Sequence, residues 1–395
     1  MAAVSALLRI DRSNGLVPMK TGKIFSMTPE AVAAIVRLSA SLNTISWLTP
    51  MDVSGCRAEV AAAVRSGRDA ISAWSFPDVD LRARIALATA ARAATDRLEP
   101  RGLDRALITL IDEAEAVLRI VRRRDDTETV VWSERRYGSP SADDRDLAAK
   151  AFNEAPSDMG GEEEILDAAE VADRARAALD AYDLDQWSVV VDNAMAANMA
   201  VKAVSKVVKV SGSIAATPTE WRRLVAHEIG GHALRAENAA RQTDPRCLLA
   251  LGDAMPTEEG LAAWIEEYLG TAHPGVVRRY AARTLAVGWA AEAGIVEVAR
   301  RLSEVLPLGE AAAIAVRVKR GLVDPNRPGA FSKDAGYWIG LNKVRRHLAA
   351  QPDDLALLMA TRWSIELLPE ARMAVGEQSS KRALLMPKPE PLSLP

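Results

Sequence analysis

Apolar residues recur at helical spacing through most of the first 155 residues of the chain. Segments 28–42, 80–98 and 102–123 place Ala, Leu, Ile and Val three and four positions apart, with charged residues between them. Such spacing buries one side of a helix and leaves the other side in water. The pattern therefore predicts a helical region over residues 28–155.

The pattern changes beyond residue 153. Residues 153–164, NEAPSDMGGEEE, combine a proline, two glycines and an acidic run, and are the best candidate for a linker. After a helical pattern at 163–182, the valine-rich segments 187–192 and 202–212 predict strands. The second segment alternates polar and apolar residues imperfectly, which favours a half-exposed edge strand. From 218 to about 375, helices are predicted again.

These elements predict an α+β fold that is predominantly α-helical, with a small sheet beside the helix that begins near residue 217. The last residues, MPKPEPLSLP, are rich in proline and are expected to be a disordered tail. The predicted divisions are an N-terminal segment, a helical region, a second domain that holds the sheet, and the tail, at residues 1–27, 28–155, 156–384 and 385–395.

The composition of the 395 residues is that of a globular protein, with 49% hydrophobic and 26% charged residues. The net charge of −3 gives no overall attraction to nucleic acid or to a membrane surface. No apolar stretch approaches the roughly 20 residues of a bilayer-spanning helix, and the N-terminus lacks the basic region of a signal peptide. Cys56 and Cys247 have no partner at metal-binding spacing and suggest no disulfide framework. We therefore expect a cytoplasmic protein without a nucleic-acid or membrane partner.

The strongest chemical signal is the sequence HEIGGH, which holds two of the four histidines. His227 is followed by Glu228, and His232 comes five positions after His227. Zinc peptidases carry a similar motif, H-E-x-x-H, in which the two imidazoles sit four positions apart on one helix face. The remaining histidines, His273 and His347, have no such neighbours, and we expect them to be structural or exposed.

The five-residue spacing requires a deformed helix if both histidines bind one metal. The segment TPTEW predicts a helix start, with Thr217 as N-cap and Glu220 completing a capping box. On an ideal α-helix, five steps leave the two side chains about 140° apart. A local π-type turn reduces this angle to roughly 50°. Gly230 and Gly231 are a weak point where such a turn could form, and two adjacent glycines are hard to explain by packing.

A zinc peptidase also needs a third protein ligand and an open position for water. The segment PTEEGLAAW predicts a helix start at 256–264, where Thr257 can cap the helix. A carboxylate from this helix would complete a His-His-Glu set. On spacing alone Glu258 and Glu259 are nearly equal candidates, and either could instead be a first-turn acid that the helix dipole favours.

These motifs together resemble the microtubule-associated tyrosine carboxypeptidase family, whose bacterial members are often labelled flavohemoglobin-expression-modulating QEGLA-motif proteins. That family has an H-E-x-x-x-H helix, usually HEIGTH, and here Gly231 replaces the threonine. TEEGLA is similar to the QEGLA element, so that Glu259 aligns with the motif's glutamate and Glu258 with its glutamine. Further similar segments are HALRAENAARQ, WLTP, WSFP, SERRYGSP, RVKRGL and GAFSKDAGYWIG, and the likeness covers most of residues 45–345.

The resemblance implies a zincin-like metallopeptidase, with the small sheet beside the H-E-x-x-x-H helix. His227, His232 and Glu259 are then the expected ligands of Zn²⁺, and Glu228 is the expected general base. An extended peptide could bind along the predicted edge strand 202–210 by strand addition.

The family activity also requires recognition of a free carboxylate, for which Arg and Lys are suited. Arg317, Arg320 and Lys333 lie in segments similar to the family's, with Tyr337 nearby as a hydroxyl donor. The expected function is a zinc carboxypeptidase that acts on the C-terminus of a peptide or protein, releasing an aromatic residue or trimming a biosynthetic peptide. Two alternatives stay open, a zinc endopeptidase or amidase and a non-catalytic regulatory protein that keeps the fold.

Overall fold

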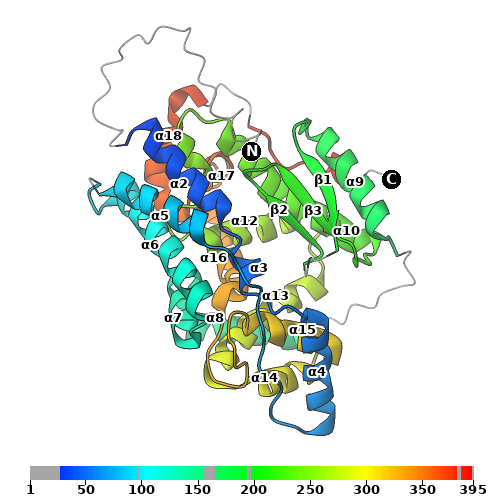
Figure 1. Ribbon diagram of the computed structural model, residues 1–395. Coiled ribbons are helices and arrows are strands. Elements are labelled where there is room, and N and C mark those ends of the chain that lie inside the picture. Colours follow the sequence, from blue (N-terminus) through cyan, green and yellow to red (C-terminus); the bar gives the residue numbers. More distant parts are fainter. Residues whose placement is uncertain are drawn as a thin grey trace.

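Helices make up most of the part of the chain that the structure describes, and a small sheet stands against them (Figure 1). This computed structural model describes residues 27–393 apart from Arg97, residues 155–164, Ala194, Ala196 and residues 380–383. The predominance of helix and the small sheet confirm this part of the predicted fold class. The helices before the sheet are α2 (Pro29–Ser41), α3 (Thr44–Trp47), α4 (Val53–Ser66), α5 (Arg82–Thr95), α6 (Gly102–Arg123), α7 (Asp126–Tyr137), α8 (Ala142–Glu154) and α9 (Ala168–Ala181).

The 22-residue helix α6 shows why apolar spacing predicts these helices correctly. It buries Leu107, Ile111, Ala114, Leu118 and Val121, which recur three or four positions apart on one side. This side packs against α5 and α7. The local period of the sequence therefore matches the face that the fold covers.

The sheet has three strands in the order β1-β3-β2. Its strands are β1 (Ser188–Asp192), β2 (Met199–Lys202) and β3 (Val207–Ser211). β1 and β3 run parallel, and β2 pairs with β3 in the antiparallel sense. Helix α9 packs on β1 and β3 (Figure 1).

The prediction of a single edge strand at 202–212 is wrong. The chain turns between β2 and β3, with Lys206 in a left-handed conformation (φ 53°), and β3 becomes the central strand. Val208 and Val210 are fully buried, while the Lys209 ammonium pairs with Asp192 of the neighbouring strand at 2.6 Å. The alternation of polar and apolar residues reflects the two faces of a central strand, because the polar face finds its partner within the sheet.

Helices dominate again after the sheet, as predicted. These elements are α10 (Pro218–Val225), η1 (Ala226–Ala233), α11 (Leu234–Ala240), η2 (Pro245–Leu248), α12 (Ala254–Tyr268), α13 (Pro274–Glu292), α14 (Ile295–Ser303), α15 (Leu308–Val318), η3 (Ser332–Ala335), α16 (Gly336–Ala350), α17 (Asp354–Ala360), η4 (Ile365–Leu367), α18 (Leu368–Ser379) and η5 (Glu390–Ser393). None of the described helices is both long and apolar enough to span a bilayer.

Helices α12 and α16 approach each other closely through two glycines. A Cβ atom on Gly260 would lie 2.1 Å from the backbone carbon of Gly340, and one on Gly340 would lie 1.9 Å from the carbonyl oxygen of Pro256. Neither position tolerates a side chain without backbone movement. This contact fixes α12 against α16. The short helix η3, which holds Lys333 and Asp334 and directly precedes α16, is thereby placed beside the acidic residues of α12.

Helices that precede the sheet in the sequence pack directly on helices that follow it. α4 lies against α14 and α15, and α8 lies against α13. One buried apolar cluster accordingly contains Val60 and Trp74 together with Ile295 and Ala312. The predicted linker falls mostly on residues 155–164, outside the described residues, and the predicted N-terminal segment falls almost wholly outside them too. The division into domains stays a prediction.

The prediction of a disordered tail is wrong for residues 385–393, the part of the predicted tail that the structure describes. The Asn238 side chain makes two hydrogen bonds with the backbone of Leu385, at 2.8 and 2.9 Å. The Tyr182 hydroxyl donates to the carbonyl oxygen of Lys388 at 3.0 Å and accepts from the backbone N–H of Lys388 at 3.1 Å. Leu392 is buried. Proline removes backbone donors, so an extended segment needs few partners. The side chains of Tyr182, which follows α9, and of Asn238 in α11 provide them.

Candidate metal centre and its cavity

One continuous helical stretch, α10 followed by η1 and α11, carries the HEIGGH motif. Thr217 caps it by accepting a hydrogen bond from the backbone N–H of Glu220 at 3.2 Å, as predicted. The predicted capping box is incomplete, because the Glu220 carboxylate pairs with Arg223 at 2.8 Å. The cap still fixes where the helix begins and hence which residues reach the motif.

The stretch departs from α-helical geometry at the motif itself. Residues Ala226–Ala233 form a π-helix, which confirms the predicted π-type turn and extends it over eight residues. The wider turn brings His227 and His232 together, with ring centroids 4.9 Å apart. Five-residue spacing and a common metal are therefore compatible in this chain.

The structure gives a different explanation for the two glycines of the motif than the predicted weak point in the helix. A Cβ atom on Gly231 would lie 2.8 Å from the Cβ of Ala262, so this glycine is required by packing against α12. A Cβ atom on Gly230 would meet Ile265 at 3.5 Å, which is an ordinary contact. The interpretation that packing does not explain the pair is wrong for Gly231.

Replacing Gly231 by alanine is expected to destabilise the protein by about 1–3 kcal/mol, because overpacking pushes α12 away from the π-helix. Gly230→Ala is the matched control, and it should leave the stability unchanged or raise it by up to about 1 kcal/mol, since alanine favours helix. Urea unfolding of the two variants measures the difference. Equal stabilities of Gly231→Ala and wild type would contradict the packing argument.

Helix α12 faces the histidines with its acidic residues. It begins at Ala254, three residues before the predicted cap, and the Thr257 hydroxyl instead accepts a hydrogen bond from the backbone N–H of Ile365 at 3.2 Å. Glu259 therefore lies in the second turn of the helix, where it is buried.

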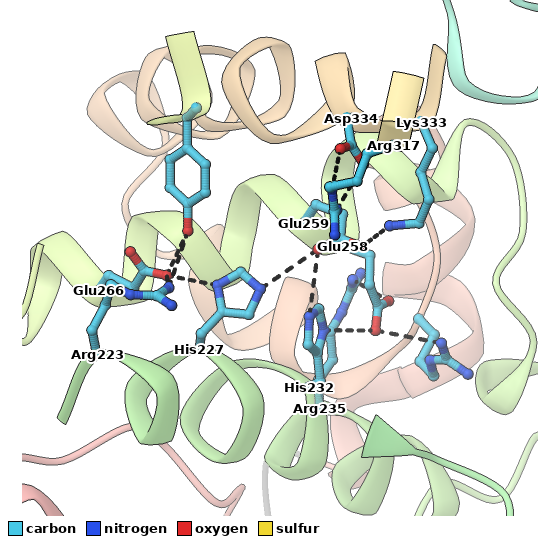
Figure 2. Close-up of polar contacts among 12 residues, drawn as sticks. Arg223, His227, His232, Arg235, Glu258, Glu259, Glu266, Arg317, Lys333 and Asp334 are labelled. Atoms are coloured by element: carbon cyan, nitrogen blue, oxygen red, sulfur yellow. Dashed lines mark hydrogen bonds and ion pairs between the residues drawn. The ribbon is translucent and has the colours of Figure 1, made fainter. Parts of the chain in front are cut away.

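One oxygen of Glu259 faces both histidines (Figure 2). Its Oε2 lies 3.5 Å from His227 Nε2 and 3.7 Å from His232 Nε2. Candidate ligand atoms of these three residues all lie within 4.8 Å of one another, an arrangement that could hold a metal ion. Zinc bonds of 2.0–2.2 Å in tetrahedral geometry separate ligand atoms by about 3.4 Å. The spacing and the nitrogen and oxygen donors therefore fit zinc.

Lys333 holds the other oxygen of Glu259. The ammonium donates to Oε1 at 2.6 Å, so Oε2 is left to face the imidazoles (Figure 2). Burial alone would raise the pKa of Glu259, but Lys333 and the imidazoles outweigh it and hold this pKa well below its ordinary value. Glu259 is therefore a carboxylate, the form that binds metals.

Glu266 fixes the orientation of His227. Its Oε1 lies 2.7 Å from His227 Nδ1 and accepts hydrogen bonds from Arg223 at 2.8 Å and from the Tyr280 hydroxyl at 2.7 Å. The carboxylate favours a proton on Nδ1, which leaves the Nε2 lone pair directed at Glu259. The side chain of Glu266 has no exposed surface.

Glu258 contacts the Nδ1 atom of His232, as Glu266 contacts that of His227. Its Oε1 lies 3.3 Å from His232 Nδ1, and its Oε2 accepts from Arg235 at 2.8 Å. Burial favours the neutral imidazole, but Glu258 and Glu259 outweigh it and raise the pKa of His232 to about 10. The negative charge of the two carboxylates favours a cation at this place, and His232 must lose its proton before it can bind a metal.

A cavity of about 700 Å³ adjoins these residues. His227 and Glu228 line it, together with apolar side chains such as Val276 and Ile314. The Glu228 carboxylate has no hydrogen-bond or ion-pair partner among the described residues, and burial raises its pKa. A carboxylate of raised basicity at the wall of a cavity is suited to accept a proton.

The four residues predicted to bind a substrate carboxylate have separate environments. Arg317 and Tyr337 line the cavity. The Arg317 guanidinium is paired with Asp334 through two bonds of 2.5 and 2.8 Å, and the Tyr337 ring stacks on His227 with centroids 6.0 Å apart. Lys333 binds Glu259, and Arg320 is buried away from the cavity lining.

Several residues of the site could not be found from the sequence, because they lie on helices that carry no recognisable motif. Glu266 could have been found, since it lies seven positions after Glu259 in the same helix and therefore on the same helix face. His273, expected to be structural or exposed, occupies the N-cap position of α13 without a side-chain capping bond and lines the cavity, while His347 pairs with Asp354 at 2.9 Å. The arginines of the cavity wall that the sequence did not single out are Arg57, Arg223, Arg279 and Arg283.

Comparison with known proteins adds independent findings. A model of the family described as "Microtubule-associated tyrosine carboxypeptidase" matches residues 78–387, more than half of the chain. The chain is 36% identical to "Microtubule-associated tyrosine carboxypeptidase 1" of Mus musculus and 34% identical to the protein of that name from Homo sapiens, each over 129 residues. These alignments cover 31% of this chain and 27% of each relative, about a quarter of the relatives' length.

Proposed function

The chain belongs to the microtubule-associated tyrosine carboxypeptidase family, and from this premise we propose that it is a zinc-dependent carboxypeptidase. The observation that carries the proposal is the convergence of His227 Nε2 and His232 Nε2 on Glu259 Oε2 beside a cavity. The substrate class is the C-terminus of a peptide or protein. The names of the mammalian relatives refer to tyrosine, and an aromatic terminal residue is one substrate to test.

His227, His232 and Glu259 would hold the zinc ion. Bound there, zinc would supply Lewis-acid activation of water and of a peptide carbonyl. The roles of the neighbouring residues follow from their contacts. Glu266 keeps His227 in the tautomer that offers Nε2, and Lys333 keeps one oxygen of Glu259 turned toward the imidazoles.

Glu228 is the proposed general base and acid. Its carboxylate lines the cavity, and it takes a proton from the attacking water as the carbon–oxygen bond forms. It then passes this proton to the leaving amine as the carbon–nitrogen bond breaks. The products are a shortened peptide and a free amino acid, and Glu228 returns to its carboxylate form.

The structure changes the strand along which we propose that the peptide binds: it is β2 instead of the predicted strand 202–210. Residues Val207–Val210 pair on both sides, with β1 and with β2, so they cannot take another strand. β2 pairs on one side only and lies against the π-helix. Asn198 and Met199 at its start line the cavity, which supports strand addition along the other edge of β2.

The positive charge of the cavity wall favours an exopeptidase over an endopeptidase or amidase. A free C-terminal carboxylate is well matched by arginine, and five arginines line the cavity. The other alternative is a non-catalytic regulatory protein, and such a protein would not need a basic carboxylate at Glu228 beside the metal cluster.

We expect the zinc-loaded protein to remove one C-terminal residue from a peptide, and to act about 10- to 100-fold more slowly on the same peptide as a C-terminal amide. The amide lacks the charge and leaves an arginine without its partner, a loss of about 1.5–3 kcal/mol. Mass spectrometry of both peptides measures the effect. Internal fragments, or equal cleavage of the amide, would favour the endopeptidase or amidase.

A further inference from the structure

The 384–393 segment lies along the helical stretch that carries the HEIGGH motif. After the π-helix, the Asn238 side chain of α11 bonds both backbone groups of Leu385. Before the π-helix, the Arg222 guanidinium of α10 donates from Nε to the carbonyl oxygen of Leu392 at 3.3 Å. The segment therefore runs antiparallel to the helical stretch and is attached to it both before and after the motif.

The segment also lies against the π-helix itself. A Cβ atom on Gly230 would lie 3.5 Å from the Ile265 side chain and 3.9 Å from the Cβ of Pro387, which is buried. These are ordinary packing distances, and they place α12 and the segment beside the same residue of the motif. The π-helix therefore packs on the 384–393 segment as well as on α12.

Two buried polar side chains bind the backbone of this segment. The Tyr182 hydroxyl pairs with both the N–H and the carbonyl of Lys388, and the Asn238 amide pairs in the same way with Leu385. Neither Tyr182 nor Asn238 is exposed to solvent to any large extent, at 3% and 0%. A buried polar group is costly without a partner, so both side chains favour the docked segment.

The π-helix depends on contacts of this kind, because its own residues favour it little. Such helices are rare and are mostly single turns within α-helices, whereas this one covers eight residues and includes two glycines, which disfavour helix. Relaxation to an ideal α-helix would turn His227 and His232 from roughly 50° to about 140° apart. The two imidazoles would then no longer face one metal.

We propose that the 384–393 segment holds the π-helix in its metal-binding geometry, and that Asn238 and Tyr182 are positioning residues for the metal centre. Neither residue belongs to the His-His-Glu cluster or to the cavity wall. Docking of the segment and binding of zinc favour the same helix geometry, so each strengthens the other by the same factor. This inference rests on the metal centre of the proposed function.

The test combines Asn238→Ala with Tyr182→Phe in the full chain and measures zinc affinity by competition with a chelator. We expect the affinity to fall about 5-fold or more, because the helix is no longer held in the geometry that binds zinc. Tyr182→Phe alone keeps the buried ring and should lower the affinity about 3-fold, which serves if the double variant does not fold. Tyr268→Phe is the matched control, since Tyr268 is exposed on α12, and it should bind zinc as wild type does. Wild-type affinity in Tyr182→Phe and in the double variant would overturn the inference.

Hydrogen exchange of the zinc-free protein separates this inference from the proposed function. We expect the amides of Ala226–Ala233 to exchange about 5-fold faster or more in the double variant, and those of α6 to exchange as in wild type, because only the motif loses its contact. If wild type binds no zinc, the proposed function fails, and faster exchange confined to the π-helix still supports the role of the segment. Unchanged exchange at Ala226–Ala233, or an equal rise in α6, would overturn it.

Discussion

Replacing Glu228 by glutamine is expected to lower kcat by about 10²- to 10⁴-fold while the protein still binds zinc. Glutamine keeps the size of the side chain but cannot accept the proton of the attacking water. The cavity and the His-His-Glu cluster keep their residues, so peptide binding should change little. Steady-state kinetics on a free peptide and metal analysis of the same sample measure the two quantities.

The zinc content decides how a loss of activity in this variant is to be read. Loss of activity with zinc retained supports proton transfer by Glu228. Loss of both would assign Glu228 to metal binding or to folding instead. A variant that retains wild-type kcat would contradict the mechanism, because the other two carboxylates that line the cavity, Glu220 and Glu310, are paired with arginines.

Replacing Glu259 by glutamine is expected to weaken zinc binding by at least about 10²-fold, because a ligand carboxylate is lost. Glu266→Gln should weaken it by about 10- to 100-fold, because Glu266 acts only through the tautomer of His227. Glu267→Gln is the matched control. Glu267 lies on the same helix and pairs with Arg345, so its loss should leave zinc affinity unchanged.

Competition with a chelator of known affinity measures the three variants. The order expected from strongest to weakest effect is Glu259, Glu266 and Glu267. Equal effects of Glu259→Gln and Glu267→Gln would contradict the assignment of Glu259 as a ligand. A strong effect of Glu266→Gln on folding can be separated by urea unfolding of the zinc-free protein.

The local features of the site could be predicted from the sequence. The capping residue Thr217 and the helical period define the helix, and the angle between His227 and His232 requires a π-type turn, which the structure has. Spacing alone did not separate Glu258 from Glu259, because both lie near the start of one helix. The resemblance favours Glu259, and the structure brings this residue to the Nε2 atoms of both histidines, whereas Glu258 contacts only the Nδ1 side of His232 and pairs with Arg235.

The features that depend on tertiary packing could not be predicted. Gly231 is explained only by the approach of α12, since nothing in its own helix requires a missing Cβ atom. Arg57 and Arg283 reach the cavity from α4 and α13, and no motif marks either residue. The turn between β2 and β3 was missed because Lys206 adopts a left-handed conformation that its residue type does not announce.

The central claim is that the His227, His232 and Glu259 cluster binds zinc and that this zinc is needed to remove a C-terminal residue. The most direct measurement is the mass of one free peptide after incubation with zinc-loaded protein, with chelated protein, and with chelated protein to which one equivalent of zinc is returned. We predict the loss of one C-terminal residue in the first and third samples and an intact peptide in the second. Cleavage by the chelated protein, or no cleavage by the loaded one, would contradict the claim.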